Sequence, residues 1–178
     1  QRTRTKHIGV LATPGTVASE SYVIELLKQD PTLIVTQQAC PMWVPLIEAG
    51  EHLHAGADYF VEKYLTELLT RDPLIDTIIL GCTHYPLLQP KIEAFLSSYS
   101  HSQSPIANHH ISVIAQGEIV ARSLADYLHR HPEIVERISS PSEGRLGGGF
   151  LTTESATKFS ESASLFLAEP IQAQHIEL

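Results

Sequence analysis

The chain has 178 residues, 43% of them hydrophobic and 18% charged, which suffices for one packed domain, or for a small domain and part of another. Its net charge of −8 disfavours a nucleic-acid partner, because phosphate binding requires clustered Lys and Arg. No apolar stretch is long enough to span a bilayer and no signal peptide is recognisable, so we expect no membrane partner. The two cysteines, Cys40 and Cys82, are too few for a disulfide framework and favour a reduced, cytoplasmic setting.

Short apolar runs alternate along the chain with amphipathic stretches. The first run, residues 8–12, predicts a buried strand, and a Pro-Gly turn at 13–16 leads into a helix with Thr16 as its N-cap. In chain order, the remaining pattern predicts strands at 33–37, 75–80, 111–115, 150–152 and 171–176, and helices at 17–29, 42–48, 59–70, 86–96, 118–129 and 155–167, with a linker over 97–110 and turns over 139–149. This alternation predicts an α/β fold with a mostly parallel sheet flanked by helices.

Three loops that follow predicted strands are candidate ligand-binding segments: 13–16, 39–48 and 81–85. In an open parallel sheet, ligands bind beyond the carboxyl ends of the strands. We therefore expect these loops to meet at one edge of the sheet, although they are far apart in sequence.

The third loop carries the strongest chemical signal, the sequence Gly-Cys-Thr-His-Tyr-Pro at 81–86. A thiol between a strand and a helix start lies near the positive end of the helix dipole, which predicts a pKa for Cys82 below the usual value of about 8.5. His84 can stabilise a thiolate or pass protons, and Thr83 offers a hydroxyl and a backbone N–H to an anion. A buried structural cysteine is the alternative, and position alone does not decide between the two.

The other two loops give weaker signals. The backbone N–H groups and hydroxyls of the first loop suit a carboxylate or phosphate, although a simple helix cap by Thr16 explains the same residues. Glu48 can hold a substrate ammonium group, although a solvent-facing glutamate explains it equally. Cys40 has no histidine beside it in sequence, so we expect it to pack near the site without acting as a nucleophile.

Metal and nucleotide sites are disfavoured. The histidines, His84 among them, form no zinc-type spacing with the two cysteines, so we expect no metal. The three glycines at 147–149 precede a predicted strand, whereas a dinucleotide-binding fingerprint follows one.

Residues 80–86, Leu-Gly-Cys-Thr-His-Tyr-Pro, resemble the LGCTHYP signature of bacterial glutamate racemases, which belong to the Asp/Glu racemase superfamily. Residues 9–17 resemble the GVLAT-x-GTV segment of that family, 39–41 its ACP element, 44–48 its VPLIE element, and 150–153 the start of its C-terminal strand and helix. The elements occur in the family's order and spacing, and the resemblance covers nearly the whole chain.

The resemblance implies two α/β domains that face each other across a cleft, each contributing one cysteine, with neither pyridoxal phosphate nor a metal. One thiolate takes the α-proton of glutamate and the opposite thiol returns a proton to the other face, because inversion requires acid and base on opposite sides. Transferred to this chain, Cys82 is one acid/base thiol and His84 assists it, while Thr83, Thr16 and Glu48 bind the substrate. The partner is then a small molecule, glutamate, converted to D-glutamate for peptidoglycan in the cytoplasm, and a homodimer is compatible with this.

The chain also departs from the family pattern. The family's Asp-Ser-Gly motif, and the Asn-Thr segment preceded by its other catalytic cysteine, do not occur here. We therefore expect residues 1–110 to form the central domain and 111–178 to complete a first domain whose N-terminal part is missing. That predicts exposed apolar surface on the C-terminal segment and a chain that is inactive alone.

Three alternatives remain open at this level. Another racemase of the superfamily, of the aspartate or hydantoin type, shares the thiol chemistry, although Thr-His-Tyr-Pro after Cys82 favours glutamate. A folded, non-catalytic binding module is the second, supported by the missing second thiol. Thiol-dependent hydrolysis is the least favoured, because we expect two residues of separation to prevent a hydrogen bond between Cys82 and His84.

Overall fold

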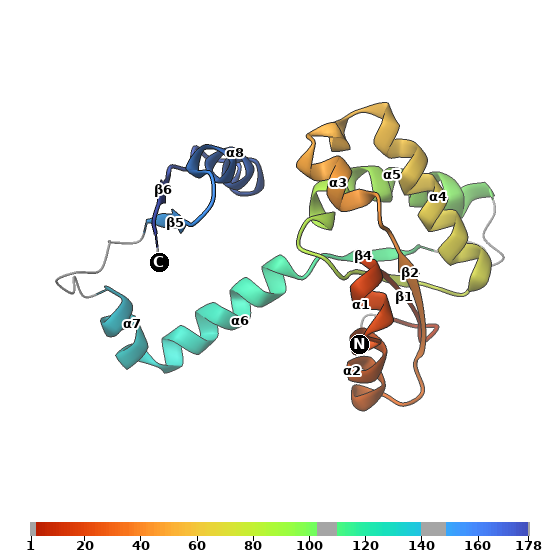
Figure 1. The fold of residues 1–178 in the computed structure, drawn as a ribbon. Helices are drawn as coiled ribbons and strands as arrows, with labels where there is room; N and C mark the ends of the chain where they lie inside the picture. Colours follow the sequence, from red (N-terminus) through yellow and green to blue (C-terminus); the bar gives the residue numbers. More distant parts are fainter. Residues whose placement is uncertain (1–2, 103–109, 140–148, 178) are drawn as a thin grey trace. The chain divides into compact units, whose positions relative to one another are not determined.

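The computed structural model describes residues 3–102, 110–139 and 149–177 (Figure 1). The chain divides into two compact units, Gln1–Ile119 and Val120–Leu178, and each is described by itself. None of the helices in the described ranges combines the length and the apolar character that crossing a bilayer requires.

The first unit is built on a four-stranded sheet in which every pairing is parallel. The strand order is β2-β1-β3-β4, so the first strand of the chain lies inside the sheet. The strands are β1 (His7–Ala12), β2 (Ile34–Ala39), β3 (Thr77–Leu80) and β4 (Ser112–Ile114). The predicted α/β fold with a parallel sheet flanked by helices is confirmed.

Helices cover both faces of this sheet (Figure 1). On one face, alternate side chains of β1 pack with residues that include Val17, Tyr22 and Leu26 from the α1 and α2 region. On the other face, a larger core is formed by β1, β3 and the helices that follow β2 and β3. The helices are α1 (Pro14–Ala18), α2 (Ser21–Gln29), α3 (Trp43–Glu48), α4 (Ala55–Arg71) and α5 (Gln89–Ser102), with short 3-10 helices η1 (Glu51–Leu53) and η2 (Tyr85–Leu88).

Several predicted boundaries were wrong, for local physical reasons. The single helix expected over 17–29 is two helices, because Glu20 adopts a left-handed backbone conformation with φ of 53°. Thr16 is not the N-cap: Thr13 caps α1 and accepts a hydrogen bond from the Thr16 N–H. A 3-10 turn precedes α5, so the long helix begins at Gln89 instead of at residue 86. That helix also occupies part of the expected linker, whereas 103–109 lie outside the described residues.

The fourth strand belongs to the first unit. Thr77 pairs with Ser112 and Ile79 with Ile114, which fixes β4 against β3. Residues 111–115, grouped with the C-terminal segment in the sequence, therefore complete this sheet. The connection to the second unit is α6 (Gly117–Arg130), which begins in the first unit.

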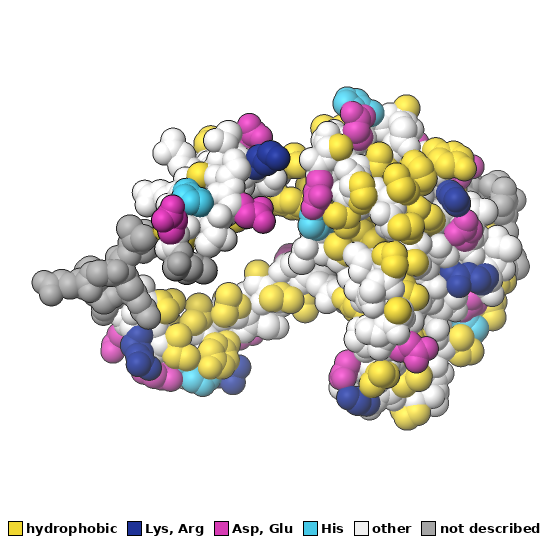
Figure 2. Space-filling model, viewed as in Figure 1, with side chains coloured by type: hydrophobic (Ala, Val, Ile, Leu, Met, Phe, Trp, Pro, Cys, Tyr) yellow, Lys and Arg dark blue, Asp and Glu magenta, His cyan; other side chains and the backbone are white. Residues whose placement is uncertain are grey.

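The second unit contains a small β-α-β element. Strands β5 (Phe150–Thr152) and β6 (Ala173–His175) pair in parallel, and α8 (Ala156–Leu167), capped by Ser155, connects them. An additional helix, α7 (Pro132–Ser139), follows α6. Apolar side chains of α6 and α7 are exposed and appear yellow along these helices in Figure 2; they include Val120, Leu124, Tyr127 and Ile138.

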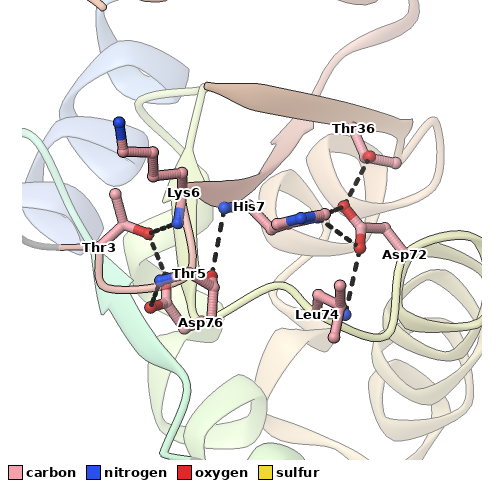
Figure 3. A network of polar contacts seen from close by, with 8 residues as sticks. All are labelled: Thr3, Thr5, Lys6, His7, Thr36, Asp72, Leu74 and Asp76. Carbon is pink, nitrogen blue, oxygen red and sulfur yellow. Dashed lines mark hydrogen bonds and ion pairs between the residues drawn. The ribbon is translucent and has the colours of Figure 1, made fainter. Parts of the chain in front are cut away.

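Two buried aspartates hold the amino-terminal edge of the sheet (Figure 3). Asp72 contacts the His7 imidazole at 2.9 Å and accepts a hydrogen bond from the Thr36 hydroxyl at 3.3 Å, which links α4 to the two neighbouring strands. Asp76 accepts hydrogen bonds from the Thr3 hydroxyl at 2.6 Å and from the backbone N–H of Arg4 and Thr5. These bonds attach the segment before β1 to the start of β3.

A close approach between sheet and helix requires glycine at position 9. A Cβ at Gly9 would lie 2.8 Å from Leu68 Cδ2 and 3.3 Å from Ile78 Cγ1, closer than real Cβ atoms come to either neighbour without displacing it. Gly9→Ala should therefore lower the free energy of unfolding by about 1–3 kcal/mol, measured by urea titration, because the added methyl overpacks the core. The control is Gly56→Ala, where open space surrounds the new methyl and no loss is expected. Equal stability of the two variants would contradict the close approach.

Asp76 makes folding stability depend on acid pH. Burial raises the pKa of Asp76, but the hydrogen bonds from Thr3, Thr5, Arg4 and Thr77 outweigh it and lower the pKa to about 2. A depressed folded-state pKa contributes stability above the unfolded value, and this contribution is lost as the pH falls toward 2. Asp76→Asn should therefore lower the free energy of unfolding at pH 7 by on the order of 1–3 kcal/mol and flatten its decline between about pH 4.5 and 2.

The measurement is urea unfolding at a series of pH values, with Asp126→Asn on the exposed side of α6 as the matched control. An unchanged acid slope in Asp76→Asn would show that other carboxylates produce it.

Candidate active site

The carboxyl ends of all four parallel strands lie at one edge of the sheet, as the loop analysis predicted. Two backbone bonds tie the neighbouring loops to β1: the Cys40 N–H donates to Ala12 O at 2.9 Å, and the Gly81 N–H donates to Leu11 O at 2.8 Å. The loops after β2 and β3 therefore begin next to the end of β1. This arrangement brings Thr13, Cys40 and the turn that carries Cys82 to the same edge.

Gly81 sets the path of the chain into that turn. A Cβ at this position would lie 3.1 Å from Tyr22 Cε2, 3.2 Å from Ala12 Cβ and 3.2 Å from Leu11 O. Any side chain would push α2 or β1 away, so only glycine fits without displacing a neighbour. The close approach places the next residue, Cys82, directly beyond the end of β3.

Cys82, His84 and Glu48 form a continuous line of contacts. The Cys82 sulfur lies 3.8 Å from His84 Nδ1, and His84 Nε2 lies 3.3 Å from a carboxylate oxygen of Glu48 at the end of α3. The imidazole is mostly covered, whereas the Glu48 side chain is 61% exposed. The expectation that Cys82 and His84 are too close in sequence to contact each other was therefore wrong, because the turn between β3 and η2 folds His84 back toward the sulfur.

This geometry permits proton transfer. The Glu48 carboxylate can only accept at neutral pH, so it favours the imidazole tautomer with the proton on Nε2. Nδ1 then faces the Cys82 sulfur as an acceptor. A proton can move from the thiol to Nδ1, which leaves a thiolate beside an imidazolium that Glu48 stabilises.

The remaining predicted site residues are less closely connected. Thr16 lies inside α1, half-buried, and its hydroxyl is 2.9 Å from the Thr13 hydroxyl. Thr83 is exposed between the two catalytic candidates. Within the described part of the chain, the hydrogen bonds of the Thr16 side chain stay inside its own loop, and the structure joins only Cys82, His84 and Glu48 of the five predicted residues.

Cys40 is a core residue beneath the site. Its side chain is 1% exposed, and burial raises the pKa of its thiol well above the ordinary value. The hydroxyl of Tyr85 donates to Cys40 O at 3.2 Å, and the Tyr85 ring packs edge-on against Trp43 at 4.7 Å. A buried thiol that is difficult to ionise fits the predicted packing role.

No group of three or more His, Cys, Asp or Glu side chains suited to a metal ion occurs within residues 3–102, 110–139 and 149–177. The contacts of Cys82, His84 and Glu48 therefore describe an acid–base arrangement instead of a three-ligand metal site.

Comparison with models of known protein families gives no match. The glutamate racemase of Lactiplantibacillus plantarum is 34% identical over 172 residues, which cover 96% of this chain and 57% of that protein. The crystal structure of glutamate racemase isoform RacE1 from Bacillus anthracis superimposes with a TM-score of 0.75 at 30% identity, covering 99% of this chain and 59% of that one. This chain is homologous to the glutamate racemases.

A further solved structure, the glutamate racemase of Thermus thermophilus in complex with beta-chloro-D-alanine, has a TM-score of 0.66 at 27% identity and covers 97% of this chain and 57% of that one. The chain spans a little over half the length of the curated glutamate racemases that it matches. The resemblance read from the sequence motifs is thus confirmed over nearly the whole chain.

Sequence reasoning missed one residue at this edge. Gln116 follows β4, and its side-chain amide donates to Leu80 O at 3.1 Å and to the Tyr22 hydroxyl. The same rule that selected the loops after the first three strands applies to the fourth. The signal was therefore present, but the loop after β4 was read only as the start of a helix.

The two cysteines should differ sharply in reactivity. With iodoacetamide under native conditions, we expect Cys82 to be alkylated at least about tenfold faster than Cys40, because only an accessible thiolate reacts. Mass spectrometry of peptides from timed samples measures both rates, and the same reaction in urea provides the control in which the difference disappears. Equal native rates would contradict the burial of Cys40.

Proposed function

We propose that this chain carries one of the two acid/base groups of a cofactor-independent glutamate racemase, with Cys82 as the proton-carrying thiol. The observation that carries the proposal is the contact line from Cys82 through His84 to Glu48. Homology to proteins named glutamate racemase supports the reaction and the substrate. The complex of the Thermus thermophilus relative with beta-chloro-D-alanine supports a small amino-acid-like ligand.

In the proposed reaction, the Cys82 thiolate removes the α-proton of glutamate and becomes a thiol. His84 holds the thiolate form beforehand by accepting the thiol proton at Nδ1, and Glu48 balances the charge of the resulting imidazolium. In the reverse direction, the thiol of Cys82 returns a proton to the same face of the substrate. Glu48 thus supports the imidazole in this proposal, a role that differs from the substrate-ammonium contact expected from sequence.

The second acid/base group must come from outside this pair of cysteines. Inversion requires a proton donor on the opposite face of the α-carbon, and the chain has only Cys40 and Cys82. Cys40 is buried in the core, and its raised pKa makes it a poor base. We therefore propose that this chain does not racemise glutamate by itself.

The domain arrangement is part of the same proposal. The first unit would act as the domain that carries Cys82, and residues of the second unit would complete a domain whose other part is supplied by a further polypeptide segment. The exposed apolar side chains of α6 and α7, which include Val120, Leu124 and Ile138, support a covering partner, because such surface is costly in water. A homodimer of the completed protein is compatible with this.

Substrate binding is assigned by position. Thr83 next to Cys82, and Thr16 at the start of α1, offer hydroxyls and backbone N–H groups near the same edge, which suit the two carboxylates of glutamate. Aspartate shares this chemistry with one methylene less, so an aspartate racemase is the second candidate. Its test is the same assay with the shorter substrate.

The decisive experiment measures exchange of the glutamate α-hydrogen with deuterium oxide, by NMR, together with inversion, by polarimetry. The chain is assayed alone and fused behind the N-terminal segment of the Lactiplantibacillus plantarum glutamate racemase that it does not cover. We expect inversion only in the fusion, and Cys82→Ala should reduce it by at least about 10³-fold, because removal of a catalytic acid/base typically costs 10²–10⁴.

Cys40→Ala is the matched control and should retain most of the activity of the fusion, since that thiol only packs in the core. If a folded fusion neither exchanges nor inverts glutamate or aspartate, the racemase assignment is wrong. Inversion by the chain alone would instead overturn the proposal that a second segment supplies the opposite group.

A further inference from the structure

The turn that carries Cys82 is held on its β4 side by a side chain instead of by the sheet. The β3–β4 register ends at the pair of Ile79 and Ile114, one residue before the end of β3. Leu80 O lies beyond this last pair, and the Gln116 amide donates to it at 3.1 Å. A side chain thus extends the hydrogen bonding of the sheet by one step, at the residue two positions before Cys82.

The same amide also reaches the other face of the turn. Gln116 Nε2 donates to the Tyr22 hydroxyl at 2.5 Å, and the Tyr22 ring lies against Gly81 at the distance where a Cβ would stand, 3.1 Å. Gln116 and Tyr22 therefore hold Leu80 and Gly81 from two sides. Both are half-buried, so water competes only partly for these bonds.

The contacts join three elements that are distant in sequence. Tyr22 belongs to α2, Leu80 ends β3, and Gln116 immediately precedes α6, the helix that continues into the second unit. A displacement of the start of α6 would therefore act on the end of β3 through one amide. No residue of this clasp belongs to the line of Cys82, His84 and Glu48.

We propose that Gln116 and Tyr22 form a positioning clasp that fixes the Gly81–Cys82 bend and so sets where the Cys82 sulfur lies. The part of this proposal that concerns catalysis rests on the proposed function. The clasp itself does not, because the position of a thiol can be measured without a substrate. Neither residue is assigned contact with the reacting atoms; they act through the backbone on either side of Gly81.

The first test is alkylation of the full chain by iodoacetamide at about pH 10, where an accessible thiol of ordinary pKa near 8.5 is ionised and the rate reports access. Gln116→Leu removes the amide at similar volume, and Tyr22→Phe removes only the hydroxyl and keeps the ring against Gly81. We expect each to raise the Cys82 rate at least threefold. The double variant should show less than the product of the two effects, because both act on one bond.

Cys40 serves as the internal control for folding, since unfolding would expose both thiols whereas a loosened turn exposes only Cys82. The matched variant is Gln89→Leu, which removes an exposed amide bonded to Glu93 on α5 and should leave the Cys82 rate unchanged. Unchanged rates in both Gln116→Leu and Tyr22→Phe would overturn the clasp. If Gln116→Leu exposes Cys40 as well, Tyr22→Phe alone carries the test.

The second test uses the fusion in the exchange assay. A positioning role predicts that Gln116→Leu lowers kcat about tenfold with KM within about threefold, since a small misplacement of a reacting group costs rate more than binding. An equal loss in Gln89→Leu, or a loss confined to KM, would contradict the positioning role. A fusion without any activity would refute the proposed function and leave the alkylation result to decide the clasp.

Discussion

The parallel register of β1 with β2 and β3 is the constraint on which the site depends. It places Ala12 beside Ala39 and Leu11 beside Leu80, so the loops after the three strands start level with one another. Parallel pairing alone brings carboxyl ends to one edge, because every strand points the same way. A shift of β3 by one residue would turn its side chains to the opposite faces and move Gly81 away from Tyr22. The core on both faces of the sheet resists such a shift.

The two edges of the sheet are built differently. At the amino edge, Asp72 and Asp76 use their carboxylates on neighbouring backbone and side chains, and these bonds are buried. At the carboxyl edge, His84 is partly covered and Glu48 is largely exposed. Buried and satisfied polar groups make one edge rigid, whereas the groups at the other edge retain proton-transfer capacity and access to solvent. The sheet therefore holds the chemistry at one edge by fixing the other.

Much of the fold was predictable from the sequence because its signals are local and periodic. The apolar runs found the strands, and the alternation with helices found the parallel sheet. The failures occurred where a single backbone conformation decides the outcome, as at Glu20, whose left-handed conformation divides one expected helix into two. Glutamate carries no signal for that conformation, which packing of the two helices on the sheet stabilises against local preference.

The site was predictable in its residues but less so in its contacts. Cys82, His84 and Glu48 were selected one by one from their chemistry, yet their alignment depends on a 3-10 turn at 85–88 in place of a direct helix start. Spacing of two residues says little about a contact when the intervening backbone turns sharply. Gln116 could not be selected by chemistry at all, because an amide after a strand is common. Only the end of the β3–β4 register shows why this one matters.

Cys82 thus occupies the point at which the regular hydrogen bonding of the sheet stops. On the β1 side, Gly81 still donates a backbone bond to Leu11 O, so β3 is held there by the ladder itself. On the β4 side the ladder has ended, and a side chain replaces it at Leu80 O. A backbone bond survives almost any substitution, whereas a side-chain bond is lost with one. The placement of the sulfur is therefore tolerant of sequence change on one side of β3 and dependent on a single glutamine on the other, which is also the side from which α6 leads to the second unit.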